Sequence, residues 1–227
     1  MSKRIALRLW SVRGGEQGVE VNVERVVCAG FSGRNQEAVR KHIEELRGLG
    51  VPAPEKTPTY YLVAPYLLFT DQERGHYEVK GEETSAEAEF VAIMGEKTYI
   101  TVGSDHTDRW LEKVSIERAK HSCPKIISSV VWDYEEVKEH WDSISLRCFV
   151  KDNGEWRVYQ DGRLAQLLPL DTLIREFNIG RGAILFSGTI PTVGGKIIYG
   201  REYRLELDDQ VLGRKITLTY TVSPIWP

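Results

Sequence analysis

The chain has 227 residues, 41% of them hydrophobic, and its formal net charge is −3. This length allows one large domain or two small ones, with a sizeable core in either case. A nearly balanced charge offers no attractive field to nucleic acid or to an anionic membrane surface. No apolar run approaches the roughly 20 residues that a membrane span needs. We therefore expect a globular protein without nucleic-acid or membrane partners.

The cysteine pattern and the N-terminus bear on the compartment. Cys28, Cys123 and Cys148 are widely spaced, odd in number and without a C-x-x-C motif, which is typical of a reducing environment. The first residues contain no apolar segment followed by a small-residue cleavage site, so they do not have the pattern of a signal peptide. We expect a cytoplasmic protein.

The chain begins with a predicted β-hairpin. Residues 5–10 and 19–28 alternate apolar with polar side chains, and Gly14-Gly15 lies between them. This alternation is the pattern of half-buried strands.

A predicted helix follows a glycine-rich turn at residues 28–35. Ser32 or Asn35 could cap its N-terminus, and glycines with a proline near residue 50 end it. His42 and Glu45 are three positions apart and so are neighbours on the helix surface. Taken alone, these two side chains are better interpreted as an exposed pair.

Residues 85–125 carry the pattern strand, turn, strand, helix, with acidic residues at one end. Residues two apart in a strand point to the same face, so Glu87 and Glu89 share a face. If the turn centres on Lys97, Glu89 lies opposite Asp105, with Cβ atoms roughly 5 Å apart. A turn centred half a residue away would send Asp105 to the other face.

Three carboxylates that converge in this way would repel one another. A bound cation is the simplest remedy, and three oxygen ligands suit Mg²⁺, Mn²⁺ or Ca²⁺ rather than zinc. The Glu87-x-Glu89 pair by itself is more often a solvated strand face. Convergence with Asp105 is what favours a metal site.

The second half of the chain adds two further features. Residues 110–120 have a helical pattern and end at Lys120, and Lys125 follows shortly after. Residues 182–195 form a buried strand that opens into a loop rich in glycine and threonine. Glycines let a ligand approach the backbone closely, and free N–H groups can bind an anion.

The acidic segment resembles the fumarylacetoacetate hydrolase superfamily. Glu87-Ala88-Glu89 and, after a strand, Asp105-His106-Thr107-Asp108-Arg109 are similar to that family's E-x-E and D-x-T-x-R-type segments, whose acidic residues hold the metal. The chain is identified as a member of a domain-of-unknown-function branch of the superfamily.

Three further segments match the family in order. Gly33-Arg34-Asn35 precedes His42-x-x-Glu45, Lys120 precedes a Cys-Pro pair, and Ser187-Gly188-Thr189 lies in the late loop. The gap before His42 is longer than in the family, Lys120 is closer to the proline, and an isoleucine is inserted after Thr189.

The resemblance implies a mostly β fold with short helices (α+β), a mixed β-sheet roll like the family's C-terminal domain. It implies a single domain over residues 1–227, in which residues 1–55 form an N-terminal hairpin and a lid helix. In the family, the His–Glu pair on the lid activates a water.

The resemblance also implies roles for particular residues. The implied metal ligands are Glu87, Glu89 and Asp105; the catalytic residues are His42, Glu45 and Lys120, with Lys125 as the competing lysine; and the substrate-binding residues are Arg34, Asn35, Arg109 and Thr189.

The implied activity is hydrolysis of a C–C bond in a 1,3-dicarbonyl or acylpyruvate-type small molecule, with Mg²⁺ or Mn²⁺ as cofactor. A metal-dependent decarboxylase or isomerase of a keto acid would use the same enolate chemistry. A ligand-binding protein that kept the fold and lost the chemistry is an alternative of another class. Family members commonly pair, so we expect a homodimer.

Overall fold

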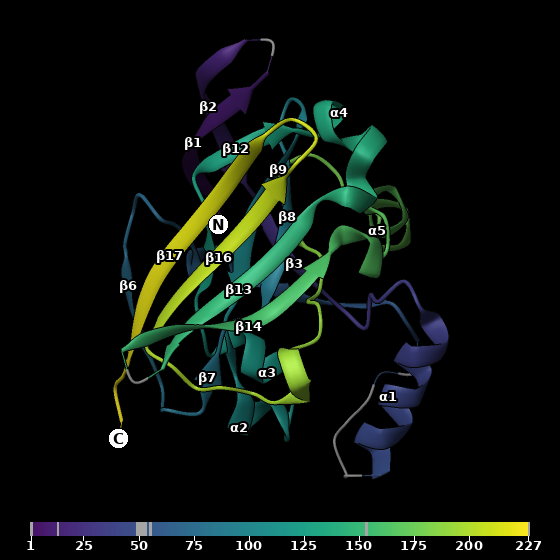
Figure 1. Cartoon of the computed structure of the whole chain (residues 1–227), viewed down its shortest axis with the longest axis vertical. Coiled ribbons are helices and arrows are strands. Elements are labelled where there is room, and N and C mark those ends of the chain that lie inside the picture. The colour runs from purple at the N-terminus through teal and green to yellow at the C-terminus, as the bar shows by residue number, and fades with distance from the viewer. Residues whose placement is uncertain (1, 13, 49–53, 55, 153, 227) are drawn as a thin grey trace.

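The computed structural model describes residues 2–12, 14–48, 54, 56–152 and 154–226, with the side chains of residues 42, 46 and 47 left out. Within these residues, two large β-sheets face one another and short helices lie around their edges (Figure 1). The predicted class, mostly β with short helices, is confirmed.

The larger sheet has ten strands among the described residues. In spatial order they are β2 (Gly15–Val23), β1 (Lys3–Ser11), β12 (Val130–Asp133), β9 (Thr98–Asp105), β8 (Ala88–Met94), β15 (Ala183–Phe186), β3 (Arg25–Gly30) and β4 (Thr59–Val63), with β11 (Lys125–Ile127) beside β9 and β5 (Leu68–Thr70) beside β11. The sheet is mixed, because β1 pairs with β12 and β3 with β15 in parallel, whereas β8 and β9 are antiparallel.

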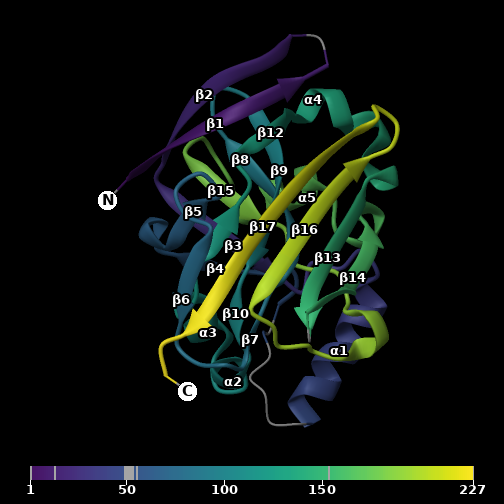
Figure 2. The same cartoon turned by 60° about the vertical axis from the view of Figure 1, so that its left-hand side comes forward.

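The smaller sheet has five strands among the described residues. Their order is β14 (Glu155–Arg163), β13 (Ser145–Asp152), β16 (Glu202–Asp209), β17 (Arg214–Pro224) and β6 (His76–Val79). Strands β16 and β17 run side by side across the front of Figure 2. Along β17 buried and outward-facing residues alternate, as expected for a sheet with one face on the core and one in water. A short third pair joins β7 (Thr84–Ser85) to β10 (Thr107–Asp108).

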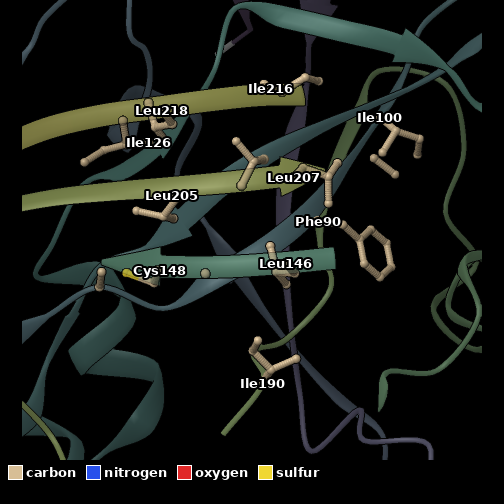
Figure 3. Packing of buried hydrophobic residues seen from close by; sticks show 14 of the residues in the cluster. Phe90, Ile100, Ile126, Leu146, Cys148, Ile190, Leu205, Leu207, Ile216 and Leu218 are labelled. Atoms are coloured by element: carbon tan, nitrogen blue, oxygen red, sulfur yellow. The ribbon is translucent and has the colours of Figure 1, made fainter. Parts of the chain in front are cut away.

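The main core lies between the two sheets. Figure 3 shows Phe90 and Ile100 from the larger sheet beside Leu146 and Leu207 from the smaller one. Full burial of such a side chain contributes about 1.5–3 kcal/mol. A second apolar cluster packs on the other face of the larger sheet. Strands β8 and β9 are therefore covered on both faces, so polar groups at their ends have little access to water.

The helices are short. They are α1 (Gln36–Gly48), α2 (Arg109–Glu112), α3 (Ile116–His121), α4 (Tyr134–Val137) and α5 (Leu170–Phe177), with 3-10 turns η1 (Pro65–Leu67), η2 (Lys138–Ser143), η3 (Leu164–Gln166) and η4 (Val193–Gly195). No helix in the described part of the chain has the length and apolar character to cross a membrane.

The predicted N-terminal hairpin is present as β1 and β2, but the run 19–28 is not one strand. It divides at Glu24, whose N–H donates to the Gly182 carbonyl at 2.8 Å. The chain there leaves β1 and continues as β3 beside β15. The alternation of β2 also ends there, because the residues of β3 are buried on both faces of the sheet.

The prediction of a single helix over residues 110–120 is wrong, because this stretch forms two short helices, α2 and α3. Asp108 caps α2 by accepting the Leu111 N–H, and Ser115 caps α3 by accepting the Arg118 N–H. Ser115 is extended, because a capping serine competes with the helical backbone. The result turns α3 back toward the strands.

Candidate metal centre

The β8–β9 hairpin brings the three predicted acidic residues together through a different register. Ala92 pairs with Ile100 and Met94 with Thr98, so the turn centres on Glu96 and the register predicted from Lys97 is wrong by two positions. A shift of two residues keeps each side chain on its face. Asp105 consequently lies beside Glu87, whose carbonyl accepts its N–H at 3.1 Å.

Carboxylate oxygens of Glu87, Glu89 and Asp105 lie within 4.8 Å of one another, and all three residues are buried. Strand pairing fixes Glu87 next to Asp105, and strand alternation puts Glu89 on the same face. The backbone ladder, more than the side chains, therefore creates the cluster.

Two lysines bind Asp105. Lys120, from α3, forms a short hydrogen-bonded ion pair with Oδ2, and Lys125, from β11, lies with Nζ 2.6 Å from Oδ1. Lys125 also donates to the His106 carbonyl at 2.8 Å. Both lysines are buried. The two lysines that the sequence left as competitors thus reach the same carboxylate.

Glu87 is held mainly by Arg109. An Arg109 Nη1 lies 3.0 Å from Glu87 Oε1, and its Nε donates to Ser85 Oγ at 2.8 Å. Glu87 Oε2 lies 3.4 Å from both Lys120 Nζ and the Thr107 hydroxyl. Arg109, predicted to bind substrate, therefore contacts a predicted metal ligand directly.

Glu89 is bound on one oxygen only. Its Oε2 accepts the Gly188 N–H at 2.8 Å, and its Oε1 is buried without a hydrogen-bond partner among the described residues. A buried carboxylate oxygen without a partner is costly. Three buried carboxylates around such an atom fit a hard divalent cation, which prefers oxygen ligands.

The three carboxyl groups differ in their proton affinity. Burial opposes ionisation of Asp105, but the Lys120 and Lys125 ammonium groups outweigh it and hold its pKa well below the usual range. At Glu87, burial raises the pKa of the carboxyl group, but the positive charges of Arg109 and Lys120 outweigh burial, so the pKa is lowered. Burial and the charge of Asp105 raise the pKa of Glu89 well above its usual value. Glu89 is thus the carboxyl group of the three without a direct ion pair among the described residues, and the charge of Lys120 only partly offsets the rise in its pKa.

Arg34 and Asn35, both predicted to bind substrate, form hydrogen bonds to other groups of the protein. Arg34 forms a bidentate pair with Asp142, both N–O distances being 2.7 Å, and its Nε donates to the Leu167 carbonyl. Asn35 Oδ1 caps α1 by accepting N–H groups from residues 37 and 38. Both side chains fix the path of the chain into α1.

His42 and Glu45 lie on α1, which projects from the sheets in both views (Figures 1 and 2). The side chain of His42 is outside the described part of the structure, and Glu45 is exposed. Part of the predicted N-terminal region, residues 49–53 and 55, also lies outside the described residues. The lid and its water-activating pair stay predictions.

Thr189 lies next to the segment that carries Glu87 and Glu89, and its hydroxyl donates to the Ala88 carbonyl at 2.9 Å. It also accepts from the Gln160 amide at 2.8 Å. Sequence reasoning missed Gln160, since it lies in a hairpin of the other sheet with no motif around it. Tyr61, an aromatic with no assigned role, lies with its ring centroid 5.9 Å from Lys120 Nζ.

Residues 29–220 match the family described as "Protein of unknown function (DUF2848)". No curated protein matches the chain. Among solved structures, a protein from Yersinia pestis CO92 described as a fumarylacetoacetate hydrolase family protein aligns at 21% identity and a TM-score of 0.65, covering 96% of this chain and 100% of that one.

Two further structures align over most of the chain. One, from Oleispira antarctica and described as a fumarylacetoacetate isomerase/hydrolase, has 20% identity, a TM-score of 0.64, and coverage of 95% and 99% of the two chains. The other is 2-keto-3-deoxy-D-arabinonate dehydratase complexed with magnesium and 2,5-dioxopentanoate, with 18% identity, a TM-score of 0.62, and coverage of 89% and 74%. At these identities the likeness shows the fold.

Proposed function

The chain belongs to the DUF2848 family and has the fumarylacetoacetate hydrolase fold; from this premise we propose that it is a divalent-metal-dependent enzyme acting on a small keto acid or diketone. The observation that carries the proposal is the buried cluster of Glu87, Glu89 and Asp105, in which Glu89 Oε1 has neither a hydrogen bond nor an ion pair among the described residues. Arg109, Lys120 and Lys125 form ion pairs with Glu87 and Asp105, whereas a cation would supply the partner that Glu89 Oε1 lacks among the described residues.

Glu87, Glu89 and Asp105 would hold Mg²⁺ or Mn²⁺, with Ca²⁺ as a further candidate. When bound, such an ion polarises a carbonyl and stabilises the enolate that leaves when a C–C bond breaks.

Lys120, Lys125 and Arg109 supply the positive charge around the acidic cluster. Arg109 is shared with Glu112 at 2.8 Å, so these cations face Glu87, Glu89, Asp105 and Glu112, and a divalent ion would still leave an excess positive charge. An anionic substrate offsets that excess, which favours a keto acid over a neutral diketone. We propose that Lys120 would offset negative charge that develops on a substrate carbonyl oxygen.

We propose hydrolysis of an acylpyruvate-type C–C bond as the reaction. His42, oriented by Glu45, would take a proton from water as the water oxygen bonds to the acyl carbon. The bond to the neighbouring CH₂ then breaks, its electron pair forms the enolate of the departing keto acid, and that carbon takes up a proton.

A keto-acid decarboxylase or isomerase is the second candidate. It would use the same enolate without water attack, so it would not need a base on α1. The observation in its favour is that Arg34 and Asn35, at the start of α1, bind structural partners.

An assay panel separates these activities. Purified protein is supplied with Mg²⁺ or Mn²⁺ and tested on acylpyruvates, β-diketones and oxaloacetate. A hydrolase consumes an acylpyruvate, and His42→Ala loses about 10²–10⁴-fold in kcat with unchanged metal binding. A decarboxylase consumes oxaloacetate alone and is unaffected by His42→Ala. A panel without any turnover, together with tight metal binding, favours a binding protein.

We also propose that two chains associate, as expected from the resemblance. Light scattering should then give about twice the 25.9 kDa mass of one chain. The mass of a single chain at every working concentration would refute this.

A further inference from the structure

The Gln160 side chain lies at the boundary between the two sheets, next to the Glu87-Ala88-Glu89 segment. It belongs to β14 of the smaller sheet and is 1% exposed. Its Oε1 accepts the Ala88 N–H at 2.9 Å, and its Nε2 donates to Thr189 Oγ1 at 2.8 Å and to the Ile190 carbonyl at 2.5 Å. A buried amide with both its oxygen and its nitrogen bound is held in one orientation.

The main-chain ladder beside Glu89 ends at this point. Strand β15 pairs with β8 through Phe186 and Val91, and the last main-chain bond runs from the Ser187 N–H to the Phe90 carbonyl. The same register would next pair Gly188 with Glu89 and then residue 189 with residue 88. The backbone instead turns away at Gly188, which has φ 81°.

Side chains replace the missing ladder bonds. The Thr189 hydroxyl donates to the Ala88 carbonyl, and the Gln160 amide oxygen accepts the Ala88 N–H. The Gly188 N–H, next to these two bonds, donates to Glu89 Oε2. Only glycine fits there, because a Cβ at Gly188 would come within 2.1 Å of Ser32 Oγ.

We propose that Gln160 is a positioning residue, which clamps the Glu87-Ala88-Glu89 segment to the Gly188–Thr189 turn and so aims the carboxylate of Glu89. This inference rests on the proposed metal site. The printed hydrogen bonds of Gln160 go to Ala88, Thr189 and Ile190 rather than to the acidic residues, and they fix the two backbone segments between which Glu89 is held. Groups of this kind, one step removed from a metal, commonly change metal affinity 10–100-fold (about one to two orders of magnitude) when lost.

The test is Mn²⁺ titration of Gln160→Met, which keeps the side-chain length and removes all three hydrogen bonds. The matched control is Gln166→Met, because Gln166 also binds a backbone N–H, that of Arg163, but lies at η3. We expect Mn²⁺ affinity about 10–100-fold weaker in Gln160→Met and parental in the control, at temperatures where both are folded. Parental affinity in Gln160→Met overturns the proposal.

Amide hydrogen exchange of the metal-free protein gives a second readout that needs no metal. In Gln160→Met the Ala88 and Gly188 amides should exchange at least about tenfold faster than in the parent, with distant amides of β16 unchanged. Unchanged exchange at both amides also overturns the clamp. A parent that binds no Mn²⁺ refutes the proposed metal site instead, and exchange still decides the role of Gln160.

Thr189→Val is the alternative variant if Gln160→Met does not fold. It keeps the shape of the side chain and removes the hydroxyl at the other end of the clamp. A smaller loss of Mn²⁺ affinity in the same direction is expected, and parental affinity with parental exchange at Ala88 contradicts the clamp.

Discussion

Two regions of the molecule carry the predicted chemistry, and they differ in how their side chains are held. The β8–β9 hairpin with α3 and β11 buries Glu89, Asp105 and Lys120 among one another. Apart from the buried Ile43, the described side chains from Arg34 through α1 are half-buried or exposed, and Arg34 binds Asp142 at the protein surface. Strand pairing brings distant motifs to one point, whereas a helix reached through a loop is placed by its caps and by whatever it packs against.

The electrostatic consequences differ in the same way. Lys125 and Asp105 are fully buried, so removing either partner leaves a charge that water cannot reach. The Arg34–Asp142 pair has side chains that are 34% and 60% exposed, so water replaces a lost partner there. Substitutions in the two regions should therefore differ by a large margin in their effect on the free energy of unfolding.

The largest effect is expected for Asp105→Asn. The change leaves the buried ammonium groups of Lys120 and Lys125 without their carboxylate, which typically costs about 3–5 kcal/mol. Urea unfolding monitored by tryptophan fluorescence measures the loss in free energy of unfolding. A loss as small as that of an exposed ion pair would mean that the hairpin region is hydrated and that the contrast between the regions is false.

An intermediate effect is expected from His106, which lies beside Asp105 in the same region. Burial, with the charges of Lys125 and Arg109, lowers the pKa of His106 to about 3. In the unfolded chain a histidine titrates near about 6.5. Between these values only the unfolded chain binds the proton, so the free energy of unfolding falls as pH falls.

The contribution of His106 is complete above about pH 6.5 and decreases by up to about 1.4 kcal/mol per pH unit below it. His106→Gln, which can still bind Tyr220 and Thr84, should give a shallower pH dependence between about pH 6 and 4. Denaturant titrations across this range measure the slope. Equal slopes in the parent and the variant would show that His106 is protonated in the fold.

The smallest effect is expected for Asp142→Asn, in the exposed region. Surface ion pairs contribute about 0–1 kcal/mol, and bidentate geometry places this pair toward the upper end. The same urea experiment applies, and the loss should shrink in high salt because exposed charges are screened. A salt-independent loss comparable to that of Asp105→Asn would remove the distinction between the regions.

The sequence predicted the convergence of Glu87, Glu89 and Asp105 even though the predicted register was wrong. A strand has a period of two, so an error of two positions returns every side chain to its face. The centre of the turn, Glu96 rather than Lys97, depends on local backbone geometry that composition does not reveal. The fold class was predictable for a related reason, since alternation identifies strands whatever their partners.

Other features depend on contacts between segments distant in sequence. Gln160 reaches Ala88 across the boundary between the sheets, and no local pattern marks it. Lys120 reaches the cluster from α3, which begins after the break at Ser115, whereas Lys125 reaches it because β11 pairs with β9 directly opposite Asp105. The partner of Arg34 was likewise invisible, because Asp142 lies in a separate 3-10 turn.

The central claim is that the acidic cluster binds one divalent cation, and calorimetric titration of the metal-free protein with Mn²⁺ tests it most directly. We expect one site per chain, severely weakened in Glu89→Gln because the unpartnered Oε1 belongs to that residue. Glu117→Gln, an exposed glutamate of α3, is the matched control and should bind as the parent does. Parental Mn²⁺ binding by Glu89→Gln would contradict the account.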